Sequence, residues 1–369
     1  MCLANQNEDT GGARTLKNSK FSLFITIIVS VLLAGVLLLY PLDVYVMRPG
    51  NAYNVSEYVT VQGGDEDDKG SFSLMTVSLS KASPLMYVYA KFKDYYELIS
   101  MDQVRQEEED DQEYNIRQAK LMKDSQFNAL YVAFSRANLE YKVTFNGVYI
   151  LNIIMGGAAD GILKPGDEIV EIEGEHIDSQ AMFAQRIAEM RDQGRYDIEL
   201  VINRDDELFT NTVTLKEIPN SKGKIGLGIV FSESKSITTD PHVNIDIGTI
   251  GGPSAGLMFT LEILNQLVDE DITKGYKVAG TGEMLENGSV GRIGGVEKKV
   301  VAAHKAGMEF FFAPDDEVTE EKLKQNPNFK SNYEAATETA KKIGTTMEIV
   351  PVKTIDDALN FLKQLQPKN

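Results

Sequence analysis

A serine lies in a glycine-rich turn between a predicted strand and a predicted apolar helix. The turn reads Gly251-Gly252-Pro253-Ser254-Ala255-Gly256, with the strand at residues 243–247 and the helix at 257–267. At the start of a helix, a serine lies beside unpaired backbone N–H groups, which favour developing negative charge. The pattern therefore fits three roles: a nucleophile, an anion-binding turn, or a serine whose hydroxyl only caps the helix.

A lysine in a later segment is a candidate base for this serine. A glycine turn leads into a predicted helix in which Lys299 shares the apolar side with Ala302 and Ala303, whereas Lys298 is predicted to face solvent. An enclosed lysine loses hydration and its pKa falls, so its neutral amine can take the proton of Ser254. The alternative is a lysine whose stem follows apolar surface while its ammonium reaches water.

A histidine offers a second hypothesis for the base. The turn formally fits the G-x-S-x-G elbow of α/β-hydrolases, with His304 downstream. That fold needs an acidic residue between serine and histidine and a long parallel sheet around the elbow. Only 50 residues separate Ser254 from His304, and a small β-rich unit precedes the serine. The lysine is therefore the preferred base.

An uncharged segment near the N-terminus predicts a membrane-spanning helix. Residues 21–40 hold no charged residue and would form a helix of about 30 Å, the thickness of a bilayer's hydrocarbon core. The alternative is a cleaved signal peptide. The run is longer than a typical signal-peptide core and no clear small-residue cleavage site precedes Asp43, so a retained anchor is expected.

Charge sets the expected orientation and excludes some ligands. Residues 1–20 hold three basic residues and residues 41–60 only one, which places the tail in the cytoplasm and the rest outside the cell. The chain has 37 basic and 55 acidic residues, a surplus that disfavours nucleic acid as a ligand. The only cysteine, Cys2, lies in the tail, so no external disulfide and no cysteine-based metal site is expected. We expect no metal and no cofactor.

Short strands and one long helix follow the predicted anchor. Residues 58–61, 74–79 and 86–92 alternate or are β-branched and read as strands, with turn residues between them. A helical period extends from about residue 115 to 139.

Residues 141–216 predict a compact, β-rich unit. The run from Gly156 to Gly174 resembles a PDZ domain of the bacterial, protease-associated form. The resemblance implies that a strand edge accepts an extended peptide, and that a loop receives the chain terminus. That loop would be formed by Asn146, Gly147, Val148 and Tyr149. The alternative is a PDZ domain that serves only as a spacer.

Three motifs resemble, in their order and spacing, the proteolytic domain of Lon proteases: residues 252–256, Thr281-Gly282-Glu283 and residues 294–299. The resemblance implies Ser254 as nucleophile, Lys299 as general base and Thr281 as a hydroxyl that hydrogen-bonds the lysine. His304 would then be a structural helix residue. Residues 122–130 resemble the first helix of the same domain, which implies that the PDZ unit is inserted within the Lon-like fold.

The predicted fold class is therefore α+β, with a transmembrane helix, a PDZ domain and a Lon-like proteolytic domain. The expected segments are a cytoplasmic tail at 1–20, an anchor at 21–40, the start of the Lon-like fold at 41–140, the PDZ domain at 141–216 and the Lon-like domain at 217–369. Gly251 departs from the family, because many Lon proteases have an acidic residue three positions before the serine.

Together these parts resemble the membrane-anchored Lon-like peptidases of Gram-positive bacteria, the SepM/YlbL type. This implies an ATP-independent serine endopeptidase that cleaves extracytoplasmic peptides or unfolded proteins, including peptide pheromones. No G-x-x-x-x-G-K-[ST] motif occurs, so ATP is not an expected ligand. The alternative is a non-catalytic, membrane-tethered scaffold that binds peptide termini. The sequence carries no signal for an oligomeric state.

Overall fold

The computed structural model describes residues 12–65, 69–105, 109–248 and 250–368. The chain forms two compact units. Their residues are Met1–Arg48 with Ser78–Val104, and Pro49–Val77 with Arg105–Asn369. Cys2 and the first half of the predicted tail lie outside the described residues.

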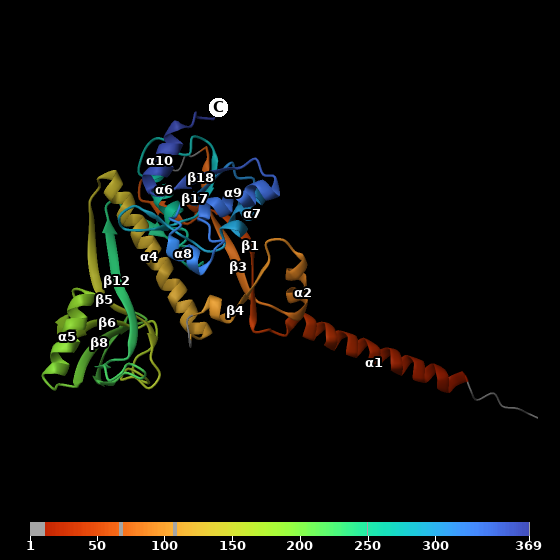
Figure 1. Cartoon of the computed structure of the whole chain (residues 1–369), viewed down its shortest axis with the longest axis horizontal. Helices are drawn as coiled ribbons and strands as arrows, with labels where there is room; N and C mark the ends of the chain where they lie inside the picture. Colours follow the sequence, from red (N-terminus) through yellow and green to blue (C-terminus); the bar gives the residue numbers. More distant parts are fainter. Residues whose placement is uncertain (1–11, 66–68, 106–108, 249, 369) are drawn as a thin grey trace, which may run out of the picture. The chain divides into compact units, whose positions relative to one another are not determined.

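The first unit contains an apolar helix, α1 (Gly12–Leu39), coloured red in Figure 1. Its segment Phe21–Leu39 is 19 residues long and none of it is buried. In the described part of the chain this is the one helix with the length and composition to cross a membrane, although a signal sequence has the same properties. The predicted N-terminal apolar helix is therefore confirmed, whereas its role stays a prediction.

The first unit also corrects one predicted strand. Residues 86–92 belong to a helix, α2 (Pro84–Phe92). The Ser83 hydroxyl accepts a hydrogen bond from the Met86 N–H at 3.3 Å, and Pro84 occupies the first turn, where its missing N–H is no loss. These start signals outweigh the alternating pattern.

The other strands of this unit are the end of β3 (Ser71–Lys81), the first part of β1 (Val44–Asn54) and β4 (Glu97–Ser100). The first part of β1 pairs antiparallel with β4, and the short helix α3 (Met101–Val104) follows.

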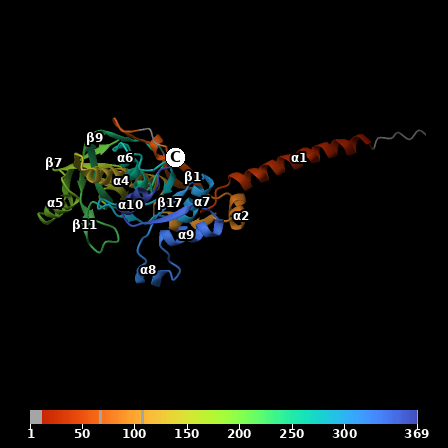
Figure 2. The same ribbon diagram turned by 90° about the horizontal axis from the view of Figure 1, so that it is seen from above.

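A parallel sheet forms the centre of the second unit. Its strands, in spatial order, are β18 (Glu348–Val352), β17 (Phe310–Pro314), β14 (Lys277–Gly280) and β3 (Ser71–Lys81), with β1 beside β3. Phe312 packs into a core with α6 (Gly256–Gln266) and α10 (Ile355–Gln364), whereas Phe311 packs into a second core with α7 (Val296–Lys305) and α9 (Asn332–Ile343). Helices therefore cover both faces of the sheet, as parallel sheets require; α7 and α9 lie side by side in Figures 1 and 2.

The long helix α4 (Asp111–Ala137) packs against α6, as Figure 1 shows. Its N-terminus has a capping box, in which the Asp110 carboxylate accepts the Glu113 N–H at 2.8 Å and Glu113 accepts the Asp110 N–H at 2.9 Å. The predicted helix is confirmed. Segments from before the β-rich unit thus pack with segments that follow it, and β2 (Val59–Val61) pairs with β13 (Val243–Ile245) in the same way.

The β-rich unit has its own hydrophobic core, filled by one helix and one sheet. The helix is α5 (Gln180–Asp192), which begins after Ser179, whose hydroxyl accepts a hydrogen bond from the Met182 N–H at 3.1 Å. The sheet order is β12 (Ile229–Thr239), β5 (Tyr141–Ile153), β6 (Glu168–Ile172), β8 (Asp197–Arg204) and β9 (Glu207–Thr214). Strand β12 lies outside the predicted span 141–216 and forms one edge of the sheet.

Short elements complete the chain. They are η1 (Val55–Glu57), β7 (Glu175–His176), β10 (Lys216–Glu217), β11 (Ile225–Gly226), β15 (Glu283–Met284), β16 (Val290–Gly291) and α8 (Glu320–Gln325).

Candidate active site

Ser254 lies in the turn that leads into α6. Gly256 begins that helix, where an added Cβ would come within 2.7 Å of the Met284 nitrogen, so only glycine fits this close approach. The N-cap position of α6 is Ala255, without a side-chain cap. The prediction that the Ser254 hydroxyl merely caps the helix is therefore wrong.

Lys299 lies on α7 and points inward with only 3% of its surface exposed. Its Nζ is 2.6 Å from the Ser254 Oγ, so its amine does not reach solvent. Ala302 and Ala303 are buried beside it, as predicted. Lys298 was expected to face solvent, and this prediction is wrong, because Lys298 is buried as well, with 7% of its surface exposed.

Thr281 follows the carboxyl end of β14 and lies between the serine and the lysine. Its Oγ1 is 2.9 Å from the Lys299 Nζ and donates a hydrogen bond to the Ser254 carbonyl at 3.0 Å. The Gly282 N–H donates to the same carbonyl, also at 3.0 Å. The hydroxyl proton is thereby committed to the carbonyl, so the Thr281 oxygen accepts an N–H from Lys299.

The environment of Lys299 favours its neutral form. Among the described residues no carboxylate lies within ion-pair distance of its amine, and burial lowers the pKa of Lys299 to about 7. At neutral pH roughly half of such amines are unprotonated. An unprotonated amine at 2.6 Å from a hydroxyl can accept its proton.

His304 lies elsewhere. It is exposed near the end of α7, with its Nδ1 2.9 Å from the Thr345 Oγ1. The hydrolase-type hypothesis is therefore wrong, because Lys299 occupies the position beside the Ser254 hydroxyl that the histidine would need.

Helix α4 holds the turn that carries the serine, a role the sequence did not reveal. The Gln118 carbonyl accepts the Gly252 N–H at 3.0 Å, and the buried Ser125 hydroxyl donates to the Pro253 carbonyl at 3.0 Å. The resemblance of residues 122–130 to a Lon helix predicted that this helix exists. Nothing in the sequence indicated that it contacts a turn more than 120 residues away.

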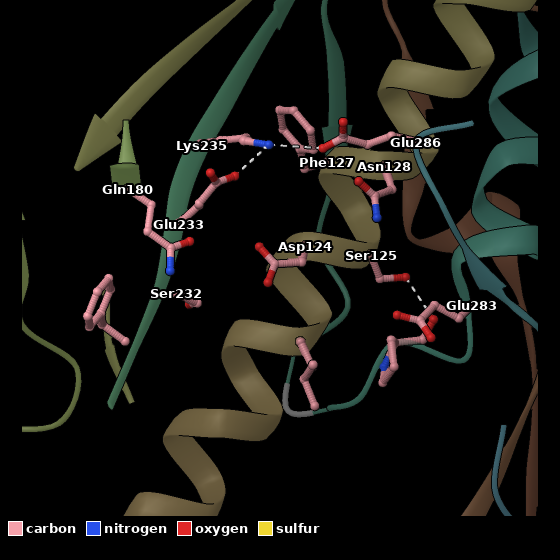
Figure 3. A pocket seen from close by; sticks show the side chains of 13 residues that line it. Asp124, Ser125, Phe127, Asn128, Gln180, Ser232, Glu233, Lys235, Glu283 and Glu286 are labelled. Carbon is pink, nitrogen blue, oxygen red and sulfur yellow. Dashed lines mark hydrogen bonds and ion pairs between the residues drawn. The ribbon is translucent and has the colours of Figure 1, made fainter. Parts of the chain in front are cut away.

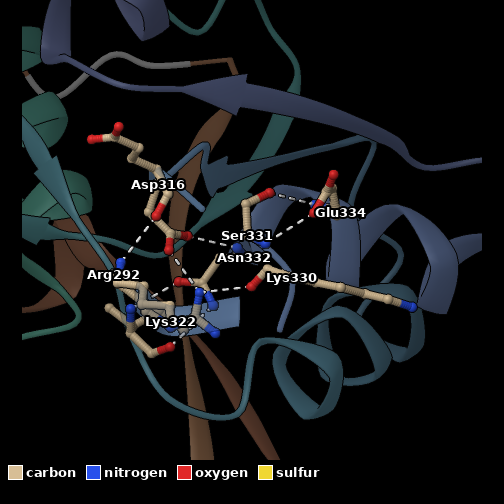
Figure 4. Close-up of polar contacts among 9 residues, drawn as sticks. Arg292, Asp316, Lys322, Lys330, Ser331, Asn332 and Glu334 are labelled. Carbon is tan, nitrogen blue, oxygen red and sulfur yellow. Dashed lines mark hydrogen bonds and ion pairs between the residues drawn. The ribbon is translucent and has the colours of Figure 1, made fainter. Parts of the chain in front are cut away.

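A polar cluster fixes the start of α7, as Figure 4 shows. The Asn332 side chain bonds both backbone groups of Ile293, accepting its N–H at 2.8 Å and donating to its carbonyl at 3.1 Å. Asp316 accepts from the Asn332 N–H at 2.7 Å and from Arg292 at 2.6 Å. The segment before α7 is therefore fixed through the backbone of Ile293 and the side chain of Arg292. Asn332 and Asp316 act as positioning residues for this helix, and no sequence motif had indicated them.

The predicted carboxylate-binding loop has a different structure. Asn146, Gly147, Val148 and Tyr149 lie within strand β5, which pairs with β12 on one side, while Val148 and Tyr149 also pair with β6 on the other. Gly147 sits at a register irregularity, where an added Cβ would come within 2.2 Å of the Ile169 carbonyl oxygen. Val148 and Tyr149 thus form sheet interior, and all four residues belong to a strand instead of a loop, because β12, the partner strand of β5, follows far later in the chain.

Across the described parts of the chain, no group of three or more His, Cys, Asp or Glu side chains is arranged to hold a metal ion.

Comparison with known proteins finds matches for the C-terminal part of the chain. Residues 209–364 match the family model of the Lon protease (S16) C-terminal proteolytic domain. The Lon protease of Mycoplasma mobile is 35% identical over 114 residues, which are 28% of this chain and 13% of that protein. The Lon protease of Acinetobacter baumannii is 32% identical over 144 residues, 38% of this chain and 16% of that one. The chain thus spans less than a fifth of these relatives, and the match supports a serine peptidase.

Solved PDZ domains are among the structural neighbours. The PDZ domain of the SdrC-like protein from Listeria monocytogenes is 28% identical and covers 24% of this chain and 92% of that one, with a TM-score of 0.22. The predicted mixed α/β fold class and the N-terminal apolar helix are confirmed, and the C-terminal residues match the model of a Lon proteolytic domain.

Proposed function

We propose that this protein is a serine endopeptidase in which Ser254 is the nucleophile and Lys299 the general base. The observation that carries the proposal is the 2.6 Å distance between the Lys299 Nζ and the Ser254 Oγ, with the lysine buried and without a carboxylate partner among the described residues. A merely structural lysine would gain stability from such a partner, and this one has none.

The first half of the reaction forms an acyl-enzyme. The Ser254 Oγ attacks a peptide carbonyl carbon while its proton moves to the Lys299 Nζ. The resulting oxyanion needs backbone donors, and the Ser254 N–H has no acceptor in the described structure. Each such donor is worth about 3–4 kcal/mol in the transition state. The C–N bond then breaks, and the Lys299 ammonium gives its proton to the leaving amine.

The second half restores the enzyme. Neutral Lys299 takes a proton from a water molecule, whose oxygen attacks the ester carbonyl of the acyl-enzyme. The ester C–O bond breaks, the proton returns to the Ser254 oxygen and the new carboxylic acid leaves. Thr281 is a positioning residue, since its oxygen accepts one N–H of Lys299 and directs the lone pair towards Ser254. No cofactor and no ATP enters this sequence of steps.

The cellular setting is part of the proposal. Residues 21–40 would anchor the protein in the membrane, with the N-terminus in the cytoplasm and the proteolytic and PDZ-like parts outside. Its substrates would then be secreted peptides, including peptide pheromones, and unfolded segments that need no ATP-driven unfolding. The wider relationship would be to the membrane-anchored SepM/YlbL-type peptidases.

The test is cleavage by the full chain in nonionic detergent. A reduced, unfolded protein is incubated with wild type and with Ser254→Ala, and products are followed by mass spectrometry. We expect cleavage by wild type only. Binding of the protein without cleavage by either form would contradict the proposal and favour a peptide-binding scaffold.

A further inference from the structure

A cleft of about 450 Å³ lies next to the serine, within the second unit (Figure 3). Helix α4 forms one wall, strand β12 the opposite wall, and the segment from Glu283 to Glu286 one end. Pro253, which directly precedes Ser254, also lines it. Its volume is within the range of ligand-binding pockets.

The cleft is strongly acidic. Four carboxylates line it, against one ammonium; they belong to Asp124, Glu233, Glu283 and Glu286, and the ammonium to Lys235. Lys235 lies 2.8 Å from Glu233 and 3.1 Å from Glu286, so its charge is already shared between these two carboxylates. Asp124 pairs with Lys120 on its own helix.

Glu283 is the carboxylate of the cleft that has no cation. It is partly buried, and in the described part of the chain it makes no hydrogen bond or ion pair through its side chain. Burial, followed by the charge of Asp124, raises the pKa of Glu283. Both effects disfavour its charged form, and a cation placed between Glu283 and Asp124 would remove the repulsion.

A second polar group of the cleft also lacks a partner. The hydroxyl oxygen of Ser232, on the β12 wall, is buried and has no hydrogen-bond partner among the described residues. Buried polar groups are nearly always hydrogen-bonded, so this hydroxyl has capacity for a polar partner. An N–H donor in the cleft therefore meets two acceptors without a partner in the described structure, Glu283 at one end and Ser232 on the β12 wall.

Glu283 is also close to the chemistry. It follows Gly282, whose N–H donates to the Ser254 carbonyl at 3.0 Å, and Ser125 of the cleft wall bonds the Pro253 carbonyl. A substrate residue in the cleft is therefore within a few residues of the bond that Ser254 attacks.

We propose that this cleft is a substrate subsite that selects a lysine or arginine side chain, with Glu283 as the specificity-determining residue. The inference rests on the proposed peptidase function. Ammonium and guanidinium groups carry the N–H donors that Glu283 and Ser232 lack, and a flexible basic side chain reaches into a narrow cleft while its backbone stays outside.

The test compares peptides that differ in one side chain. Unstructured, otherwise uncharged peptides carry a single lysine at successive positions, and matched peptides carry norleucine or glutamate there. The full chain in nonionic detergent is assayed for kcat/KM. We expect lysine to exceed norleucine by at least about 10-fold at one position, since hydrogen bonds to charged groups are among the strong ones.

Two variants assign the preference. Glu283→Gln should reduce the lysine-to-norleucine ratio to below about 3, whereas Glu207→Gln, which removes an exposed charge from β9, should leave the ratio as in wild type. Raising NaCl from 50 to 500 mM should lower the wild-type ratio, which gives a measurement independent of any variant.

The outcomes separate this inference from the proposed function. A wild-type ratio near one at every position, or a ratio that Glu283→Gln does not change, overturns the basic subsite while the peptidase stands. If no peptide is cleaved and none is attached to Ser254, both the peptidase and the subsite are wrong.

Discussion

Two lysines near the serine differ in the direction of their pKa shift. Lys299 is buried without a carboxylate partner in the described structure, and burial lowers its pKa to about 7. Burial also acts against the charged form of Lys235 in the acidic cleft, but hydrogen bonds and charges of Glu233 and Glu286 outweigh it and raise the pKa. The two sites belong to the same folded unit.

The difference shows that burial alone does not decide protonation. A counter-charge keeps Lys235 an ammonium, while its absence leaves Lys299 ready to accept a proton. Such a lysine costs stability, because the charged form is desolvated without compensation. A buried lysine with such a lowered pKa is more typical of a catalytic site than of a structural core.

The largest effect is expected when the uncompensated amine is removed. Lys299→Met should lower kcat/KM by at least about 10⁴-fold, as should Ser254→Ala, since both groups act in one step. The double variant should be no worse than either single one. Peptide cleavage by the full chain measures this, and circular dichroism checks that each variant is folded. Retained activity in Lys299→Met would contradict the role of the lysine.

The same substitution should also stabilise the protein. The pKa of Lys299 is lower in the folded chain than its ordinary value of 10.5, so the unfolded chain binds more protons between pH 7 and 10.5. Lys299 therefore lowers the free energy of unfolding by its full amount below pH 7, and this destabilisation disappears as the pH rises to 10.5. The free energy of unfolding changes by about 5 kcal/mol over this range. Urea unfolding should therefore show Lys299→Met more stable than wild type at pH 7, with the difference shrinking by pH 10. Equal pH dependence of both proteins would contradict this.

Placing a carboxylate beside Lys299 should make it resemble Lys235. Thr281→Asp puts a negative charge where the Oγ1 now lies 2.9 Å from the amine. The lysine pKa should rise, and kcat/KM at pH 7.5 should fall by about 100-fold or more. The activity lost should return in part at higher pH. Thr281→Ser keeps the hydroxyl and should retain most activity. Thr281→Asn changes the shape of the side chain as Asp does, but adds no charge. If the Asn variant were as impaired as the Asp variant, the effect of the charge would be contradicted.

The smallest effect is expected from the supports of α7. Asn332→Ala removes both hydrogen bonds to Ile293 and should lower the free energy of unfolding by about 1–3 kcal/mol. Because Lys299 then sits less firmly, kcat should fall by roughly 10-fold while KM changes little. Asn332→Asp keeps the acceptor for the Ile293 N–H, so its kcat and its free energy of unfolding should lie between those of wild type and Asn332→Ala. A change confined to stability would show that this cluster does not position the lysine.

The local chemistry of the site could be read from the sequence. Ser254, Thr281 and Lys299 were predicted together, and the structure places them within hydrogen-bonding distance of one another. The proximity was predictable because Ser254 lies in a glycine turn before an apolar helix and Lys299 on an apolar helix face, whereas Thr281 was indicated only by the resemblance to Lon proteases.

Predictions failed where distant segments decide the structure. Lys298 is buried, and its helix α7 packs against α9, which begins more than 30 residues later in the chain. Residues 146–149 lie in a strand because β5 pairs with β12, which follows roughly 80 to 90 positions further along the chain. The supports from Ser125 and Asn332 are likewise contacts between remote segments. Helix α2 differs from these cases, because its start was marked locally by Ser83 and Pro84, and the prediction of a strand was wrong despite that signal.

The central claim is that a neutral Lys299 activates Ser254, and the pH dependence of acylation tests it most directly. The full chain is mixed with an activated ester from pH 5 to 10, and acylation of Ser254 is timed by intact-protein mass spectrometry. We predict that the rate follows a single ionisation near pH 7 and falls to background in Lys299→Met. A rate that ignores pH, a midpoint near 10, or undiminished acylation in Lys299→Met would contradict the account.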